Sequence, residues 1–143
     1  MLSILQNTIT LPPFPRGCHL VTNIIYDKMP EIRNVEAGIA NIFLQHTSAS
    51  LTINENCCPD VRKDMDNWLN QYVPENFQWE HTDEGKDDMP AHMKASIVGV
   101  SLNIPVSSGK LNLGRWQGIY LNEHRNHGGA RRIVITVTGK MRE

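Results

Sequence analysis

The sequence predicts an α+β fold with a mostly antiparallel sheet, in a chain of 143 residues that suits one domain. Three observations lead to this class. Most apolar runs are short, show the alternation of β-strands, and end at Gly, Pro or Ser. Two other segments have the apolar period of helices instead. Strands and helices do not alternate in the way that a parallel βαβ sheet requires.

The first strand is expected in LQNTITL, where Leu5, Ile9 and Leu11 share one face. The segment HLVTNIIY at 19–26 is interpreted as a second strand, and DKMPEIRNV after it as a short helix or turn. GIANIFLQH at 38–46 predicts a buried strand that ends in His46, and ASLTIN at 49–54 its neighbour. The later strands are expected in SLNIPV, GKLNLG, GIYLNEH and RRIVITVTG.

Two helices interrupt this pattern. PDVRKDMDNWLNQYV places an apolar stripe on one face, and Pro59 suits its first helical position. In MPAHMKASIVG, Pro90 opens the second helix and Gly99 closes it. The expected apolar face of the first helix consists of Val61, Met65, Trp68, Leu69 and Tyr72. That of the second helix consists of Met89, Met93 and Ile97.

The composition excludes several functional classes. Fourteen basic and fifteen acidic residues give no overall charge for attracting nucleic acid or an anionic membrane surface. We find no apolar run long enough to span a bilayer and no secretory signal in MLSILQNTITL. Three cysteines, two of them adjacent, do not form a disulfide framework. A cytoplasmic protein is therefore expected.

A first polar cluster is QHTSASLTINEN, in which a histidine and three hydroxyl groups leave a buried strand. Hydroxyl, amide and backbone N–H groups of this kind can hold a phosphate. Turns rich in Ser and Thr are also common between strands, so an ordinary turn explains the pattern equally well.

A second cluster is EHTDEGKDDMPAHMK, which holds five carboxylates and two histidines. Imidazoles suit zinc-like ions and carboxylates suit magnesium, although the spacing matches no standard zinc signature. Asp88 is also placed to cap the following helix, with Asp87 near its positive end. A solvated loop with helix caps would leave His81, Glu84 and His92 unexplained.

A third cluster is LGRWQGIYLNEHRNHGGARR. Trp116 could stack on a planar ring whose edge Gln117 binds, or it could simply pack in the core. Three arginines near the strand ends could clamp a phosphate or remain solvated: Arg125, Arg131 and Arg132.

Taken together, the blocks QHTSASLTINEN, HTDEGKDDMPAHMK and IPVSSGKLNLGRWQGIYLNEHR resemble the secondary thiamine-phosphate synthase family, the small YjbQ-like proteins. The resemblance runs from about residue 5 to residue 138. It implies one domain over residues 1–143, with a β-sandwich-like, mostly antiparallel sheet and two to three helices. It also implies a homotrimer.

The resemblance implies a transferase that joins an aminopyrimidine diphosphate to a thiazole phosphate, assisted by a divalent metal ion such as Mg or Zn. The alternative is a trimeric binder of a phosphorylated metabolite or metal, with incidental synthase activity. The implied catalytic residues are His46, His81, Glu84 and His92, and the implied metal ligands are His81, Asp87, Asp88 and His92. The implied substrate-binding residues are Thr47, Ser48, Asn54, Glu55, Asn56, Gly85, Trp116, Gln117 and Glu123.

Two positions depart from the family pattern. Cys58 stands where Asp is common before the proline, and Arg115 stands where Thr is usual before Trp-Gln. Loss of an Asp N-cap would cost a helix about 1 kcal/mol. Arg115 adds a cation that could favour phosphorylated ligands.

Overall fold

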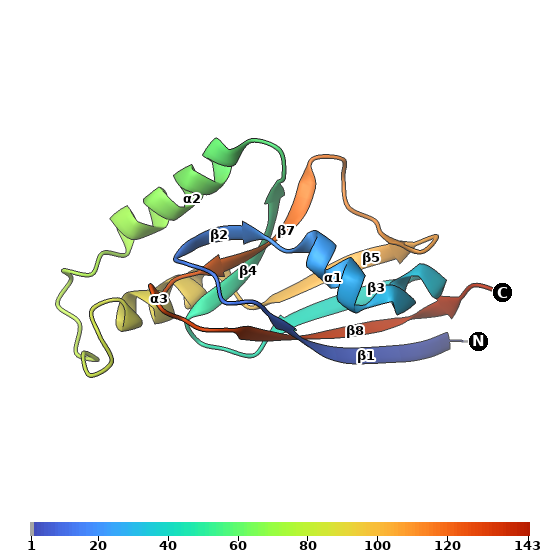
Figure 1. The fold of residues 1–143 in the computed structure, drawn as a ribbon, viewed down its shortest axis with the longest axis horizontal. Coiled ribbons are helices and arrows are strands. Elements are labelled where there is room, and N and C mark those ends of the chain that lie inside the picture. Colours follow the sequence, from blue (N-terminus) through green and yellow to red (C-terminus); the bar gives the residue numbers. More distant parts are fainter. Residues whose placement is uncertain (1) are drawn as a thin grey trace.

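In the computed structural model, which describes residues 2–143, two antiparallel sheets pack face to face (Figure 1). Met1, the first residue of the expected domain, lies outside the described residues. The larger sheet has the strand order β1-β8-β3-β5-β6, and the smaller has the order β2-β7-β4. The strands are β1 Leu2–Leu11, β2 Gly17–Leu20, β3 Val35–Leu44, β4 Ala49–Glu55, β5 Ser101–Ser107, β6 Lys110–Leu111, β7 Gln117–Glu123 and β8 Arg131–Met141.

Helices occupy the connections between strands. They are α1 Thr22–Lys28, α2 Pro59–Tyr72 and α3 Asp88–Val98, with a 3₁₀ turn η1 at Pro30–Asn34. The α+β class, the antiparallel sheet and the sandwich-like arrangement are thus confirmed. No helix within residues 2–143 is both long and apolar enough to cross a membrane.

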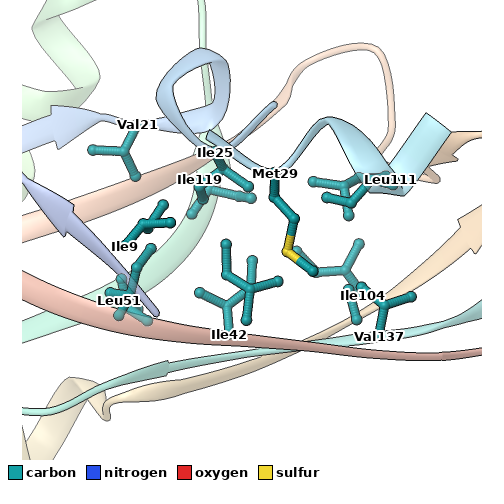
Figure 2. Packing of buried hydrophobic residues seen from close by; sticks show 14 of the residues in the cluster. Ile9, Val21, Ile25, Met29, Ile42, Leu51, Ile104, Leu111, Ile119 and Val137 are labelled. Carbon is teal, nitrogen blue, oxygen red and sulfur yellow. The ribbon is translucent and has the colours of Figure 1, made fainter. Parts of the chain in front are cut away.

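The core lies between the two sheets, because alternate side chains of each strand point inward. Ile42 and Ile104 of the larger sheet face Leu51 and Ile119 of the smaller one (Figure 2). Met29, which follows α1, fills the space beside them and is 1% exposed. The strand expectations for residues 5–11 and 49–54 agree with β1 and β4, and that for 38–46 agrees with β3 except that the strand ends at Leu44, before His46.

The second predicted strand is partly wrong. Only Gly17–Leu20 is strand, and α1 begins at Thr22. Val21, Ile25 and Met29 recur at four-residue spacing, which is a helical period, and all three are buried. Within the eight residues HLVTNIIY, which contain only Val21 and Ile25 of these three, this helical period could not be distinguished from strand alternation.

The predicted apolar faces of α2 and α3 also differ from the structure. On α2, Leu69 is buried while Trp68 and Tyr72 are 54% and 62% exposed and stack on each other. On α3, Ile97 is 59% exposed, and the buried positions are Asp88, Pro90, Ala91, Lys94 and Ala95. The inner face of α3 carries charged groups because it packs on a polar end of the sandwich.

Cys58 occupies the N-cap of α2 with extended backbone angles, φ −84° and ψ 120°, and its side chain makes no capping hydrogen bond within the described chain. Cys58→Asp should therefore raise the free energy of unfolding by about 1 kcal/mol, since a carboxylate accepts from the free N–H groups of the first turn. Urea denaturation would measure this. Cys57→Asp, an exposed neighbour outside the cap, is the control. Equal stability of the two variants would contradict the prediction.

Candidate functional site

The three polar clusters of the sequence meet only in part. Residues 45–48 follow β3, residues 124–130 follow β7, and α3 with the loop before it lies beside them, at the end of the sandwich away from the two chain termini (Figure 1). This end therefore combines the start of the first cluster, most of the second, and the end of the third.

His81, Asp88 and His92 converge at this end. His81 Nε2 lies 2.8 Å from Asp88 Oδ2, and His92 Nε2 lies 3.2 Å from the same oxygen. One ligand atom from each of the three residues lies within 4.8 Å of the others. Helix α3 brings two of the three residues together, because Asp88 and His92 are at i and i+4 on one face. His81 comes from the loop.

The Asp88 carboxylate is fixed from the opposite side. It is 1% exposed, and its Oδ1 lies 3.1 Å from Arg125 Nη1, so that Oδ2 alone faces the two imidazoles. Arg125 Nη2 also donates to the Glu84 carbonyl at 2.7 Å, which ties the loop to the strand end. A charged partner of this kind fixes the orientation of a carboxylate, as the outer partners of metal-ligating side chains do.

Asp87 does not join the three converging residues. Its Oδ2 accepts a hydrogen bond from the Asn126 N–H at 2.8 Å, and its Oδ1 accepts one from Arg125 at 3.3 Å. Burial raises the pKa of Asp87, but these hydrogen bonds outweigh it, and the pKa lies below its ordinary value. Asp87 therefore supports the site by holding the segment after β7.

The imidazole of His92 has a defined tautomer. Its Nδ1 lies 2.9 Å from the Thr47 carbonyl oxygen, which can only accept, so Nδ1 carries the hydrogen. In the neutral ring, Nε2 then presents its lone pair towards Asp88. A histidine whose outer N–H is held by a carbonyl is the usual form of a metal-ligating imidazole.

His46 is oriented by a buried chain of hydrogen bonds. The Ser48 N–H and hydroxyl lie 3.1 Å from His46 Nδ1, and Arg131 Nη2 donates to the same hydroxyl at 3.1 Å. Arg131 in turn forms a two-point ion pair with Glu123, at 2.7 and 2.6 Å. Burial and the nearby Arg131 guanidinium lower the pKa of His46. His46 is thus a neutral ring that accepts at Nδ1 and can donate from Nε2.

A cavity of about 550 Å³ adjoins these groups. It is lined by the polar residues His46, Thr47, His92 and Ser96 and by the small or apolar residues Ala95, Gly99 and Val100. His92 therefore belongs both to the converging cluster and to the cavity wall.

The other predicted substrate-binding residues lie elsewhere. Asn54 and Glu55 end β4, Asn56 follows it, and Gln117 starts β7. The antiparallel register therefore places these residues at the far ends of the strands from His46 and Glu123. Six residue steps along β4 correspond to about 20 Å. Trp116, adjacent to Gln117, is 55% exposed, with the Arg115 guanidinium 5.0 Å from its ring centroid.

These distant residues have structural partners. Asn56 donates to the carbonyls of Arg115 and Gln117, which holds the turn before β7, and Glu55 accepts from the Cys58 N–H at the start of α2.

Near the converging cluster, Gly85 has φ +105°, a left-handed conformation that suits glycine and lets the loop turn into α3. The Glu84 side chain is exposed, and its carbonyl makes the contact with Arg125.

Sequence reasoning missed several buried polar residues beside the site. Lys94 is 1% exposed, and Ser50, at 0% exposed, lies 2.9 Å from the His124 ring. Lys94 sits in an amphipathic helix and Ser50 in a Ser/Thr-rich strand, where exposed polar residues are ordinary. The signal available was the polar segment that follows β7, which contains His124 but does not reveal its burial.

His124 should make the protein sensitive to acid. Burial, and then the positive charges of Lys94 and Arg131, lower the pKa of His124 to about 3. Between pH 6.5 and about 3 the unfolded chain binds this proton and the folded chain does not, so stability falls as the pH falls. We expect this residue to contribute a slope of about 1.4 kcal/mol per pH unit.

Urea unfolding at several pH values below 6.5 measures this slope. In His124→Gln the slope should be smaller by the contribution of that residue, whatever the absolute stability of the variant. Parallel stability curves for the two proteins would show that His124 does not cause the acid sensitivity.

Comparisons with known proteins identify relatives over nearly the whole chain. The family model described as UPF0047 protein YjbQ-like matches residues 7–140. The chain is 54% identical over 135 residues to UPF0047 protein YjbQ of Salmonella typhimurium, covering 94% of this chain and 98% of that protein. It is 43% identical over 108 residues to a UPF0047 protein of Synechocystis, covering 75% of this chain and 74% of the relative.

Solved structures share the fold. A YjbQ/UPF0047 protein of Clostridium acetobutylicum, described as uncharacterized, has a TM-score of 0.77 at 34% identity, with 94% of this chain and 98% of that chain covered. A protein of unknown function from Sulfolobus solfataricus has a TM-score of 0.84 at 22% identity, covering 98% and 100% of the two chains, and shows the fold alone.

These comparisons contradict the predicted thiamine-phosphate synthase function. The relatives described above carry the UPF0047 family description or are called proteins of unknown function, and none of them carries the synthase name. The sequence blocks identify a fold family, and a fold does not determine which reaction its members perform.

Proposed function

We propose that this chain, which belongs to the YjbQ-like UPF0047 family, binds a divalent metal ion through His81, Asp88 and His92. The observation that carries the proposal is the convergence of the three ligand atoms within 4.8 Å. Metal bonds of about 2.0–2.2 Å bring ligand atoms to within roughly 4 Å of each other. Small rotations of the His81 side chain, which is 45% exposed, would complete the shell.

The hydrogen bonds around His92 favour an ion over a simple ion pair. With Nδ1–H donated to Thr47, a neutral His92 directs a lone pair at a carboxylate oxygen 3.2 Å away. Two lone pairs at that distance repel each other unless a cation lies between them. Either the ring takes a second proton or a metal ion binds there. His81 Nε2, 2.8 Å from the same oxygen, can donate a hydrogen bond to it without an ion, and in the other tautomer it would supply a second nitrogen ligand.

The ligand types favour zinc over magnesium. Two imidazole nitrogens and one carboxylate oxygen suit zinc and similar ions, whereas magnesium prefers an octahedral set of oxygen ligands. Three protein ligands also leave one position of a tetrahedral zinc site open to water or to an oxygen of a ligand, which the ion would polarise.

His46 would act beside this open position. Its Nδ1 is engaged by Ser48, so its Nε2–H is the polar group that it can offer to the cavity. A ligand oxygen could then bind the ion and accept from His46 together. We propose that the ligand is a small molecule with a phosphate or carboxylate group, in keeping with the phosphorylated metabolite expected from the sequence.

Isothermal titration of chelator-treated protein with zinc chloride tests the metal site. We expect one zinc ion per chain and much weaker binding of magnesium under the same conditions. His127→Ala, which removes an exposed histidine that does not belong to the cluster, should bind zinc like the wild type. Equal binding of zinc to wild-type protein and to a His81→Ala, His92→Ala double variant would reject the site.

The ligand proposal has a separate readout. In protein loaded with cobalt(II), inorganic phosphate should change the visible spectrum of the ion, because it would replace water at the open position. His46→Ala should still bind cobalt but require about tenfold more phosphate, as expected for one lost hydrogen bond to a charged group. A spectrum that phosphate does not change would contradict this ligand class while leaving the metal site intact.

We also propose that the chain self-associates, as the resemblance suggests, through the outer face of the larger sheet. Ile4 and Ile39 are both cross-strand partners of Thr138, so they lie in one row, and they are 72% and 58% exposed. Phe43, four residues after Ile39 and on the same face of β3, is 43% exposed. Exposed apolar patches of this kind often mark interfaces. Light scattering should give the mass of a trimer, and a monomer would contradict the proposal.

A further inference from the structure

Lys94 is a buried cation with an incomplete set of partners. Its side chain is 1% exposed, and the ammonium donates one hydrogen bond, of 2.6 Å, to Asn70 Oδ1. Within residues 2–143, no carboxylate oxygen lies within 4.0 Å of it. An ammonium group has three hydrogens to donate, and buried charges are normally paired. Lys94 therefore lacks an anionic partner.

A cavity of about 320 Å³ adjoins Lys94, between the end of α2 and α3. Arg16 lies on its wall, with Nη2 2.7 Å from Glu75 Oε1, while its Nε is buried and has no hydrogen-bond partner among the described residues. The two amides Asn70 and Asn76 also line the cavity. Two cations thus border one partly open cavity, and the Lys94 ammonium has hydrogens to donate beyond its bond to Asn70.

The charges around the cavity indicate which anion would fit. Glu75 offsets one of the two positive charges through its ion pair with Arg16, and Asp87, 3.9 Å from Arg16, is engaged mainly by Arg125 and Asn126. Asp66 also acts on Lys94, but from beyond ion-pair distance, so among the described residues Lys94 is the cation at this cavity without a direct counter-charge. These carboxylates would repel a doubly charged phosphate about twice as strongly as a singly charged carboxylate. Val73 and Pro74 give the cavity an apolar wall.

We propose that this cavity binds the carboxylate group of a small organic acid, with Lys94 and Arg16 holding the carboxylate and the short apolar part lying against Val73 and Pro74. The site is separate from the metal centre and does not depend on it. A competing explanation is that Lys94 only stabilises the carbonyl groups at the C-terminal end of α2, where a positive charge is favourable.

Saturation-transfer NMR with butyrate on chelator-treated protein tests the proposal, because butyrate then cannot bind through a metal ion. We expect transfer from the wild-type protein to the butyrate methyl and methylene protons. Lys94→Met and Arg16→Gln should each weaken binding by about tenfold or more, since each removes a charge-assisted hydrogen bond. Lys63→Met, which removes an exposed lysine of α2, should leave binding unchanged.

The variants also separate the two explanations. Under the proposal, Lys94→Met folds in the absence of butyrate, because methionine replaces an unpaired buried charge. If Lys94→Met does not fold, Arg16→Gln decides whether the cavity binds the acid. Absence of saturation transfer in the wild-type protein, or transfer that both Arg16→Gln and Lys63→Met leave unchanged, would overturn the proposal.

Discussion

Asp88→Asn should lower the affinity for zinc by more than about 100-fold, because the variant loses the only charged ligand of the cluster. The amide also cannot balance Arg125, whose guanidinium lies 3.1 Å from Asp88 Oδ1. Loss of an outer partner alone commonly weakens metal binding by about 10- to 100-fold. Zinc titration against a competing fluorescent chelator would measure the change.

Asp83→Asn is the matched control, since Asp83 is an exposed carboxylate of the same loop outside the cluster. It should bind zinc as tightly as the wild type. Circular dichroism shows whether Asp88→Asn is folded, and His92→Ala provides an independent test if it is not. An affinity that falls equally in Asp83→Asn and Asp88→Asn would mean that zinc binds by general attraction to an acidic loop.

Glu123→Gln should lower the free energy of unfolding by about 3–5 kcal/mol. Glu123 and Arg131 are 0% and 2% exposed and contact each other at two points, so the variant leaves a buried guanidinium without its counter-charge. Arg131 also holds the Ser48 hydroxyl that orients His46, so loosening this chain should weaken phosphate binding to the cobalt-loaded protein. Urea denaturation measures the first effect.

The control for this prediction is Glu36→Gln. Glu36 and Arg142 form an ion pair of 3.4 Å in which both side chains are 48% exposed, and such surface pairs contribute at most about 1 kcal/mol. Replacing both buried partners, with Glu123→Leu and Arg131→Met, should recover part of the loss because no unpaired charge remains. Similar costs for Glu123→Gln and Glu36→Gln would show that the buried pair is energetically unimportant.

The fold was largely predictable from local patterns. β1 alternates apolar and polar residues, β3 is a short, mostly apolar run, and α2 begins at Pro59 as expected. α1 was missed because strand and helix periods overlap in a short apolar run. The buried face of α3 was missed because its inward residues include Asp88 and Lys94, which a hydrophobic pattern assigns to solvent.

The site was predictable in composition but not in arrangement. His81, Asp88 and His92 stood close together in one block, and the i, i+4 spacing of the last two already put them on one helical face. The residues Asn54 to Asn56 were grouped with His46 because they are near in sequence, yet an extended strand carries them about 20 Å away. The roles of Arg125 and Arg131 as partners of carboxylates depend on tertiary contacts that no local pattern encodes.

A crystal structure of the protein soaked in zinc, with anomalous data at the zinc edge, would test the central claim most directly. We expect one strong peak per chain, with His81 Nε2, Asp88 Oδ2 and His92 Nε2 at bonding distances of about 2.0–2.2 Å. Direct hydrogen bonds among these three residues without a zinc peak between them, in a crystal that contains zinc elsewhere, would contradict the metal centre.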